Sequence, residues 1–167
     1  MRLRSFTDYG LRALMLAGVR HPERITIREI AQCYGLSAHH LLKIVQALRR
    51  LGYLASSRGR GGGLRLALAP EQIRIGTVVR QMESDFALVD CMTDNRRKSC
   101  VIHPACRLQH SLHRALEAFL AVLDGYTLAD LVRDADELTM LMGRTERRTR
   151  SKRRVRAPAA YRRARRA

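Results

Sequence analysis

The chain has 167 residues, which fit one domain of ordinary size or a smaller domain with appendages. Its net charge of +17 favours a polyanionic partner, because neutralising phosphates releases condensed counterions. No stretch approaches the ~20 consecutive apolar residues of a membrane-spanning helix, and no apolar run with a small-residue cleavage site follows the N-terminus. We therefore expect a cytoplasmic protein with no membrane partner, in which thiols stay reduced and seldom form disulfides.

The excess positive charge is concentrated at the C-terminus. Residues 144–167 hold 12 Lys or Arg and one acid, whereas residues 1–143 hold 20 Lys or Arg and 14 acids. The terminal segment is low in complexity and rich in Arg and Ala, a composition that predicts a basic disordered tail. Because such charge runs are usually solvated, the moderately basic body is the better indication of a nucleic-acid partner.

Three helices are predicted in the N-terminal third of the chain. Apolar residues recur at helical spacing over 6–20. Thr26 and Glu29 then have the spacing of a capping box at the start of a second helix. The tight turn YGLS at 34–37 follows, and Ser37 is expected to cap a third helix. Two short helices joined by a glycine-containing turn are typical of a helix-turn-helix.

A β-hairpin is predicted directly after the third helix. Tyr53-Leu54 begins one strand, the glycine-rich segment 56–63 provides a basic turn, and residues 64–68 alternate like a returning strand. A hairpin in this position is a wing. The sequence therefore predicts a mainly α fold with a small β-hairpin wing, in which a winged helix-turn-helix DNA-binding domain spans 1–82.

A cysteine-bearing loop and a long helix are predicted next. After a short helix within 73–83, the loop extends to residue 104 and an amphipathic helix runs from Ala105 to Asp124. The apolar stripe of this helix contains Leu108, Leu112, Leu116, Phe119, Leu120 and Leu123. One small domain would not cover such a stripe, so we expect it to pack against a second copy in a homodimer. The cluster-binding loop is thus assigned to 83–104, and the dimerisation helix with a C-terminal short helix to 105–143.

The N-terminal half of the third helix is the predicted DNA-reading surface, because this part of a helix-turn-helix enters the major groove. Its candidates for base edges and nearby phosphates are Ser37, His39, His40 and Lys43. Arg58 and Arg60 lie among glycines at the wing tip and suit a narrow, electronegative minor groove. The alternatives are an ordinary polar helix face and a solvated loop, but the wing and the basic body together favour DNA.

Three cysteines, Cys91, Cys100 and Cys106, fall within sixteen residues and are separated by eight and five residues. Thiolates are the soft ligands that zinc and iron–sulfur clusters prefer. The short two-cysteine knuckle of structural zinc sites is missing, and wide loop spacing suits a cluster. Free thiols and a zinc-binding module remain open as alternatives. The fourth cysteine, Cys33, is expected to be a buried core residue.

Nothing in the sequence indicates an enzyme. The glycine-rich segment at 59–63 lacks the Gly-Lys-Ser/Thr ending of a phosphate loop, and it leads into a strand instead of a helix. A C-x-x-C pair and a nucleophile–base motif are also missing. We therefore expect a binding protein without catalytic residues.

Five segments of the sequence, in order, resemble the winged-helix iron–sulfur regulators of transcription. They are FTDYGLRAL (6–14), YGLS (34–37), GRGGGLRLA (59–67), CVIHPACRL (100–108) and DGYTLADLV (124–132). The similarity covers about residues 1–132, nearly without gaps. It is greatest to the nitric-oxide-sensing repressors within this family.

The resemblance implies an iron–sulfur cluster-dependent repressor that binds double-stranded DNA as a homodimer, at an inverted-repeat, AT-rich operator. It further implies that nitric oxide is the signal and that nitrosative-stress genes are derepressed. The cluster would be held by Cys91, Cys100 and Cys106, with Asp8 of the partner subunit as the fourth ligand. A [4Fe-4S] cluster is favoured over [2Fe-2S]. Carboxylate ligation leaves one iron labile, which gives nitric oxide a point of entry.

Within the same family, the alternative is an IscR-like regulator of iron–sulfur cluster assembly genes. Such members have a His three residues after the last cysteine, where this chain has Gln109. The presence of Asp8 and the absence of that His favour the nitric-oxide-sensing branch. Two features depart from the family pattern: the gap between Cys91 and Cys100 is longer than usual, and the basic tail has no counterpart.

Overall fold

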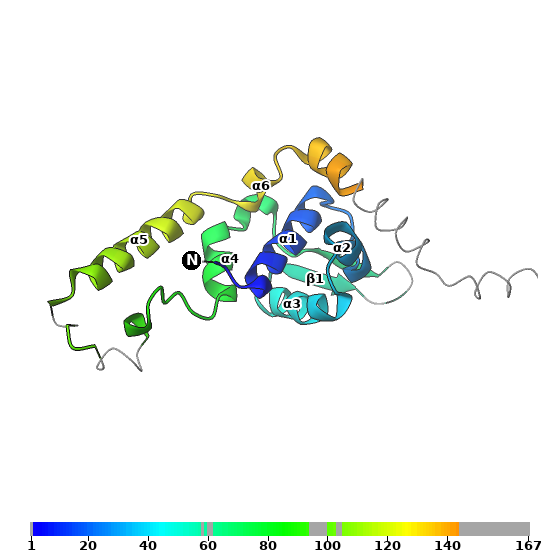
Figure 1. Cartoon of the computed structure of the whole chain (residues 1–167). Coiled ribbons are helices and arrows are strands. Elements are labelled where there is room, and N and C mark those ends of the chain that lie inside the picture. The colour runs from blue at the N-terminus through cyan, green and yellow to red at the C-terminus, as the bar shows by residue number, and fades with distance from the viewer. Residues whose placement is uncertain (1, 58, 60–61, 94–99, 103–104, 144–167) are drawn as a thin grey trace, which may run out of the picture.

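The structure is a computed structural model that describes residues 2–57, 59, 62–93, 100–102 and 105–143 (Figure 1). In chain order its elements are α1 (Ser5–Val19), α2 (Ile27–Tyr34), α3 (Ala38–Arg50), β1 (Leu54–Ser57), β2 (Gly63–Leu66), η1 (Pro70–Gln72), α4 (Ile75–Met82), η2 (Asp90–Met92), α5 (Arg107–Asp124) and α6 (Leu128–Leu131). Residues 135–143 form a further helical segment. The two strands form one antiparallel hairpin among these helices, which confirms the mainly α fold with a small wing.

The helix-turn-helix is formed by α2 and α3, with α1 packed against them. At the start of α2, Thr26 Oγ1 accepts a hydrogen bond from the Glu29 N–H at 3.2 Å, and the Glu29 carboxylate accepts one from the Thr26 N–H at 2.6 Å. This confirms the predicted capping box. Gly35 ends α2 with φ of 66°, a left-handed conformation that glycine adopts without strain. Ser37 occupies the N-cap position of α3, but its hydroxyl makes no capping hydrogen bond within the described structure, so that part of the prediction is wrong.

The wing is tied to the body by a third segment of backbone. β1 and β2 pair antiparallel with Leu54 opposite Leu66. On the other side of β2, Ile25 and Leu64 exchange both backbone hydrogen bonds, each 2.8 Å long. A single bridging residue has no alternating pattern, so this pairing could not be predicted. It fixes the base of the wing to the segment between α1 and α2.

The hydrophobic core unites α1, α2, α3, the wing and α4. Its fully buried side chains include Leu14, Leu16, Ile30, Leu41, Ile44, Leu48, Ile73, Val78, Val79 and Leu128. Thr7 is also fully buried, and its hydroxyl donates a hydrogen bond of 2.6 Å to Glu83 Oε2. Cys33 is 3% exposed among these residues, which confirms its predicted place in the core. We call this unit, α1 to α4 with the wing, the head.

Helix α5 extends away from the head as an arm (Figure 1). It begins at Arg107, with Cys106 as the N-cap residue, and not at Ala105 as predicted. Leu116 is buried, whereas the apolar side chains of Leu108 and Val122 are 64% and 62% exposed. Across the part of the chain that the structure describes, no helix combines the length and apolar character needed to cross a membrane.

After α5 the chain returns to the head. The Ile75 N–H donates to the Tyr126 carbonyl at 2.9 Å, and the Leu128 N–H donates to the Ile73 carbonyl at 2.8 Å. Leu128 and Val132 belong to the same buried cluster as the residues of α1. Backbone hydrogen bonds to Ile73 and Ile75 therefore hold the segment after α5 against the head. The division of the chain into domains at residue 105 stays a prediction.

Candidate nucleic-acid interface and cysteine site

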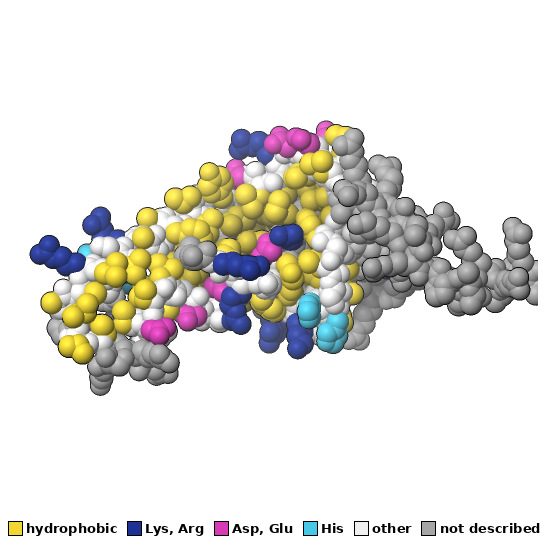
Figure 2. All heavy atoms as spheres, viewed as in Figure 1, with side chains coloured by type: hydrophobic (Ala, Val, Ile, Leu, Met, Phe, Trp, Pro, Cys, Tyr) yellow, Lys and Arg dark blue, Asp and Glu magenta, His cyan; other side chains and the backbone are white. Residues whose placement is uncertain are grey.

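Helix α3 separates its apolar and polar side chains onto opposite faces. The buried face consists of Leu41, Ile44, Val45, Ala47 and Leu48. The predicted DNA-reading residues Ser37, His39, His40 and Lys43 are all exposed. Figure 2 shows histidine side chains beside Lys and Arg side chains along the edge of the head that α3 forms. The structure thus brings these residues together on the exposed face of α3, the helix that a helix-turn-helix presents to a major groove.

The polar face of α3 extends beyond the four candidates for base and phosphate contacts. Gln46 and Arg50 are exposed as well, and they follow Lys43 by three and seven residues, so all three lie on one side of the helix. Gln46 was missed as a candidate, although the helical spacing from Lys43 was a usable signal. The rings of His39 and His40 lie with centroids 6.3 Å apart, and both residues are exposed.

The wing carries one described basic residue, Arg65, on β2. Arg65 is exposed between the buried side chains of Leu64 and Leu66. Gly59 has φ of 96°, a conformation that other residues rarely adopt, so a glycine is required at this point of the turn. Arg58 and Arg60 lie outside the described residues, and their minor-groove role stays a prediction.

The three clustered cysteines occupy the end of the molecule opposite the wing (Figure 1). Cys91 lies in η2, Cys100 follows in the loop, and Cys106 is the N-cap residue of α5. All three are free thiols with partly buried side chains. Cysteine sulfur is the soft ligand that iron–sulfur clusters use, so the donor chemistry of these three side chains fits such a group.

A closed metal site is not formed by the described residues. No three side chains of His, Cys, Asp or Glu among them gather closely enough to hold a metal ion. The segments 94–99 and 103–104, which connect the three thiols along the chain, lie outside the description. The fit to an iron–sulfur cluster therefore rests on the chemistry of the ligands. These are three free thiols, in η2, in the loop that follows it and at the start of α5.

Asp8, the predicted fourth ligand, lies in the first turn of α1 on the surface of the head. Its Oδ1 accepts a hydrogen bond from Arg12 Nε at 2.9 Å, and the two side chains are 40% and 43% exposed respectively. The Arg12 guanidinium also lies 5.9 Å from the ring centroids of both Tyr9 and Tyr34. Asp8 joins no cluster of described metal-ligating side chains in its own chain, and its role as a ligand from the partner subunit stays a prediction.

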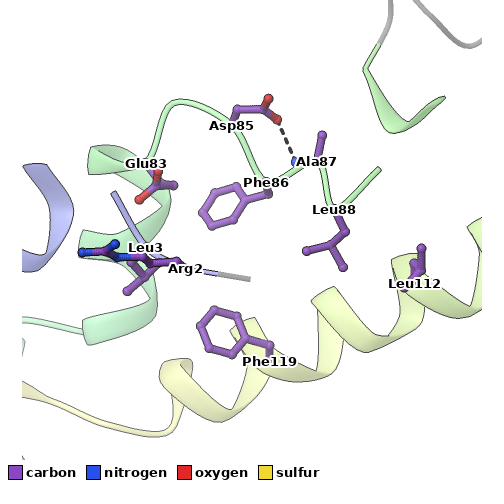
Figure 3. A pocket seen from close by; sticks show the side chains of 9 residues that line it. All are labelled: Arg2, Leu3, Glu83, Asp85, Phe86, Ala87, Leu88, Leu112 and Phe119. Atoms are coloured by element: carbon purple, nitrogen blue, oxygen red, sulfur yellow. Dashed lines mark hydrogen bonds between the residues drawn. The ribbon is translucent and has the colours of Figure 1, made fainter. Parts of the chain in front are cut away.

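A hollow of about 400 Å³ separates the arm from the cysteine-bearing segment and the N-terminus (Figure 3). Phe86, on the loop after α4, and Phe119, on α5, lie on opposite sides of it, with Leu88 and Leu112 nearby. Asp85 Oδ1 shapes the loop by accepting the Ala87 N–H at 2.7 Å. In a single chain the apolar face of α5 is thus incompletely covered.

Comparison with known protein families identifies the fold. The family model Rrf2, described as an iron-dependent transcriptional regulator, matches residues 3–134. The chain belongs to the Rrf2 family. This assignment confirms the winged-helix regulator family expected from the five sequence segments.

This Rrf2 protein is similar to several regulators named NsrR. It is 48% identical over 143 residues to the HTH-type transcriptional regulator NsrR of Bacillus subtilis, a match that covers 85% of this chain and 97% of that protein. The NsrR of Geobacillus kaustophilus matches with the same identity and the same coverage. The predicted likeness to that branch of the family is confirmed.

Solved structures of other regulators share the Rrf2 architecture. A transcriptional regulator from Listeria innocua has a TM-score of 0.65 at 32% identity, covering 80% of this chain and 87% of that one. T. potens IscR has a TM-score of 0.61 at 26% identity, covering 82% and 90%. CymR, the global cysteine regulator of B. subtilis, has a TM-score of 0.60 at 27% identity, covering 80% and 97%. The Rrf2 protein is accordingly a DNA-binding regulator of transcription with a winged-helix head.

Proposed function

We propose that this Rrf2 protein is an iron–sulfur cluster-dependent repressor that senses nitric oxide and derepresses nitrosative-stress genes. The observation that carries the proposal is the placement of three free thiols on the loop and first turn of an arm whose other end is rooted in the DNA-reading head. The 48% identity to NsrR over 97% of that protein supports the same function.

The proposed cluster ligands are Cys91, Cys100 and Cys106, with Asp8 of the partner subunit as the fourth. When bound, the cluster supplies the iron with which nitric oxide reacts. Three thiolates hold it firmly, whereas a carboxylate is a harder and weaker ligand for such iron. Because Asp8 shares its carboxylate with Arg12, a change in its ligation also changes the free charge on α1. The [4Fe-4S] form remains the favoured one.

A homodimer is part of the proposal, because α5 leaves apolar surface without cover. Leu108 and Val122 are more than half exposed, and Figure 2 shows hydrophobic side chains spread along the arm. Contiguous apolar patches of this kind are typical of protein interfaces. We expect two paired copies to present their α3 helices to successive major grooves of an AT-rich inverted repeat.

The test of the cluster uses the full chain, reconstituted anaerobically with ferrous iron and sulfide. We expect bound iron and acid-labile sulfide, visible absorption, and tight binding to a DNA duplex that the loaded protein selects from a random pool. Nitric oxide should lower that affinity. The variant Cys106→Ser should lose the absorption, whereas Cys33→Ala should keep it, because Cys33 belongs to the core. A colourless protein that binds the duplex regardless of nitric oxide would disprove the proposal.

The fourth ligand and the dimer have their own tests. Asp8→Ala should change the cluster spectrum, and the exposed Asp136→Ala should not; identical spectra would exclude Asp8. Phe119→Glu should convert a dimer to a monomer in analytical ultracentrifugation, because it places a charge in the apolar stripe. Ala121→Glu is the control, since its spacing places it on the opposite face of α5.

The second candidate, an IscR-like regulator of cluster assembly genes, has less support. The IscR structure is 26% identical to this chain, and Gln109 stands where such members have a His. The measurement that separates the two is whether nitric oxide, or simple depletion of iron and sulfide, is required to release the duplex.

A further inference from the structure

The C-terminal end of α5 is clamped to α4 by a two-point ion pair. Arg80 donates to both carboxylate oxygens of Asp124, with Nη1–Oδ1 at 2.5 Å and Nη2–Oδ2 at 2.7 Å. Hydrogen bonds from Arg80, and then its charge, hold the pKa of the Asp124 carboxyl below its ordinary value. A paired, planar geometry of this kind fixes direction as well as distance, because both oxygens must face the guanidinium at once.

Gly76 makes this close approach possible. An ideal Cβ built on Gly76 would lie 2.8 Å from Asp124 Cγ and 2.9 Å from the Asp124 backbone nitrogen. Atoms of a real side chain do not approach backbone so closely, so any larger residue would force α5 away from α4. The short antiparallel bridge of Arg74 with Thr127 lies beside this contact. We call Gly76, Arg80 and Asp124 the pivot.

A continuous series of packed groups leads from the pivot to the DNA-reading helix. Two residues beyond Arg80 on α4, the side chain of Met82 fills the space that a Cβ on Gly10 would occupy, with Sδ only 2.6 Å from it. The same Cβ position lies 3.7 Å from Cγ2 of Ile44, on the buried face of α3. At Gly10, therefore, the Met82 side chain of α4 and the Ile44 side chain of α3 meet at the backbone of α1, which gives a tilt of α4 a route to α3.

The opposite end of α5 carries Cys106. With 18 residues at a rise of about 1.5 Å each, the helix is about 27 Å long, so a rotation of about 10° at one end moves the other by about 5 Å. The arm is packed tightly at the pivot, whereas a hollow of about 400 Å³ lies along its middle. When the cysteine end of α5 moves, the helix therefore rotates about its contact with α4 at Asp124.

We propose that the pivot of Gly76, Arg80 and Asp124 transmits the position of the cysteine end of α5 through Met82 and Gly10 to the DNA-reading helix α3. In this arrangement the three are positioning residues and touch neither the thiols nor the DNA. The inference rests on the proposed function for the origin of the movement, but the mechanical link is a property of the chain itself.

The experiment compares two pivot variants with matched controls in the full-length protein. Gly76→Ala inserts the Cβ for which there is no room, and Gly143→Ala is its control, because nothing lies within 4 Å of a Cβ there. Arg80→Gln removes one exposed ion pair, and Arg133→Gln removes another, the 3.3 Å pair with Asp130, which has no link to α4.

The first readout needs no cluster. In the cluster-free protein, both pivot variants should speed hydrogen–deuterium exchange at the Ile75 and Leu128 amides, and Gly76→Ala should also speed it at Ile44 in α3. Neither control should change these rates. For Gly76→Ala, faster exchange at Ile75 and Leu128 with an unchanged rate at Ile44 would overturn the proposal, because the disturbance would not have reached α3.

The second readout is the ratio of DNA affinities with and without the cluster, for which a coupled wild-type protein is expected to give about 5 to 150. The pivot variants should bring this ratio below about 3, within the range of weak coupling, while the cysteine-based absorption is retained. A wild-type ratio of one means that the cluster does not change DNA affinity, which contradicts the proposed function. In that case the pivot is tested by hydrogen–deuterium exchange at Ile44 alone. A normal wild-type ratio that both variants preserve contradicts the pivot alone.

Discussion

Gly63 illustrates how a single residue sets the position of the wing. An ideal Cβ on Gly63 would lie 2.9 Å from the carbonyl oxygen of Ile25, the residue that bridges to β2. Glycine is therefore required there by close approach of two backbones and not by a special dihedral angle. The sequence shows a run of glycines at 61–63, but only the structure distinguishes the one that supports this contact.

Replacing Gly63 with Ala should destabilise the head by about 1–3 kcal/mol, because a backbone oxygen cannot move aside as a flexible side chain can. The measurement is the free energy of unfolding from urea titration of the purified protein. Gly143→Ala, which meets open space, should leave that free energy nearly unchanged. Equal stability of the two variants would show that the Ile25 bridge is not tightly held.

Lys43 is the residue of α3 on which the DNA interface can be tested most directly, because it is exposed on the helix face that also presents Gln46 and Arg50. Lys43→Ala should weaken binding and reduce the slope of log affinity against log salt by about one, as expected for loss of one phosphate contact. Arg133→Ala removes an exposed charge from the segment after α6 and should leave both quantities unchanged. A salt slope unaffected by Lys43→Ala would exclude a phosphate contact.

Among the structural elements, those with strong local signals were predicted and those made by distant contacts were not. The Thr26–Glu29 capping box and the hairpin at 54–66 depend on residues a few positions apart, so their pattern is visible in the sequence. The Ile25 bridge and the return of Leu128 to the core join segments far apart in the chain. The exposed residues of α3 could be predicted from helical periodicity. Whether the three cysteines come together could not be predicted, because that depends on a second copy or on loops outside the described residues.

The capping box of α2 is an element whose contribution can be measured in isolation. Thr26→Ala removes the oxygen that accepts the Glu29 N–H, and it should lower the free energy of unfolding by about 1 kcal/mol. Thr77, an exposed residue in the first turn of α4, provides a control for loss of a threonine, and Thr77→Ala should have a smaller effect because the N-cap of α4 is Arg74 and no cap is lost. If the two variants are equally stable, the cap makes no net contribution.

At the scale of the whole molecule, the proposed DNA-reading surface, the cysteines and the most basic segment belong to different parts of the chain. The head carries the proposed reading surface on α3 at one side, while the cysteines lie at the end of the molecule where α5 begins, opposite the wing. The basic segment 144–167, outside the described residues, supplies 12 of the 32 Lys and Arg residues. This division suggests separate contributions: selection of sequence by α3, and general attraction to phosphates by the terminal segment.

Truncation after Gly143 tests that division. It removes 12 Lys or Arg and one acid, which lowers the net charge from +17 to +6. Affinity for unrelated DNA and the salt slope should both fall, because fewer counterions are released, while the preference for the selected duplex over a scrambled one is retained. A loss of sequence preference on truncation would show that the segment takes part in reading bases.

The path of the chain through the core has a consequence for how such proteins can diversify. The polypeptide leaves the core after Glu83 and re-enters it at Leu128, where the Leu128 N–H bonds to the Ile73 carbonyl. Of the described residues between these points, Phe86, Leu120 and Leu123 are partly buried against that core, so the segment can be exchanged for another provided that these contacts are replaced. The same DNA-binding head could in this way carry different sensor segments, provided that each segment ends in a helix that can pack closely against Gly76.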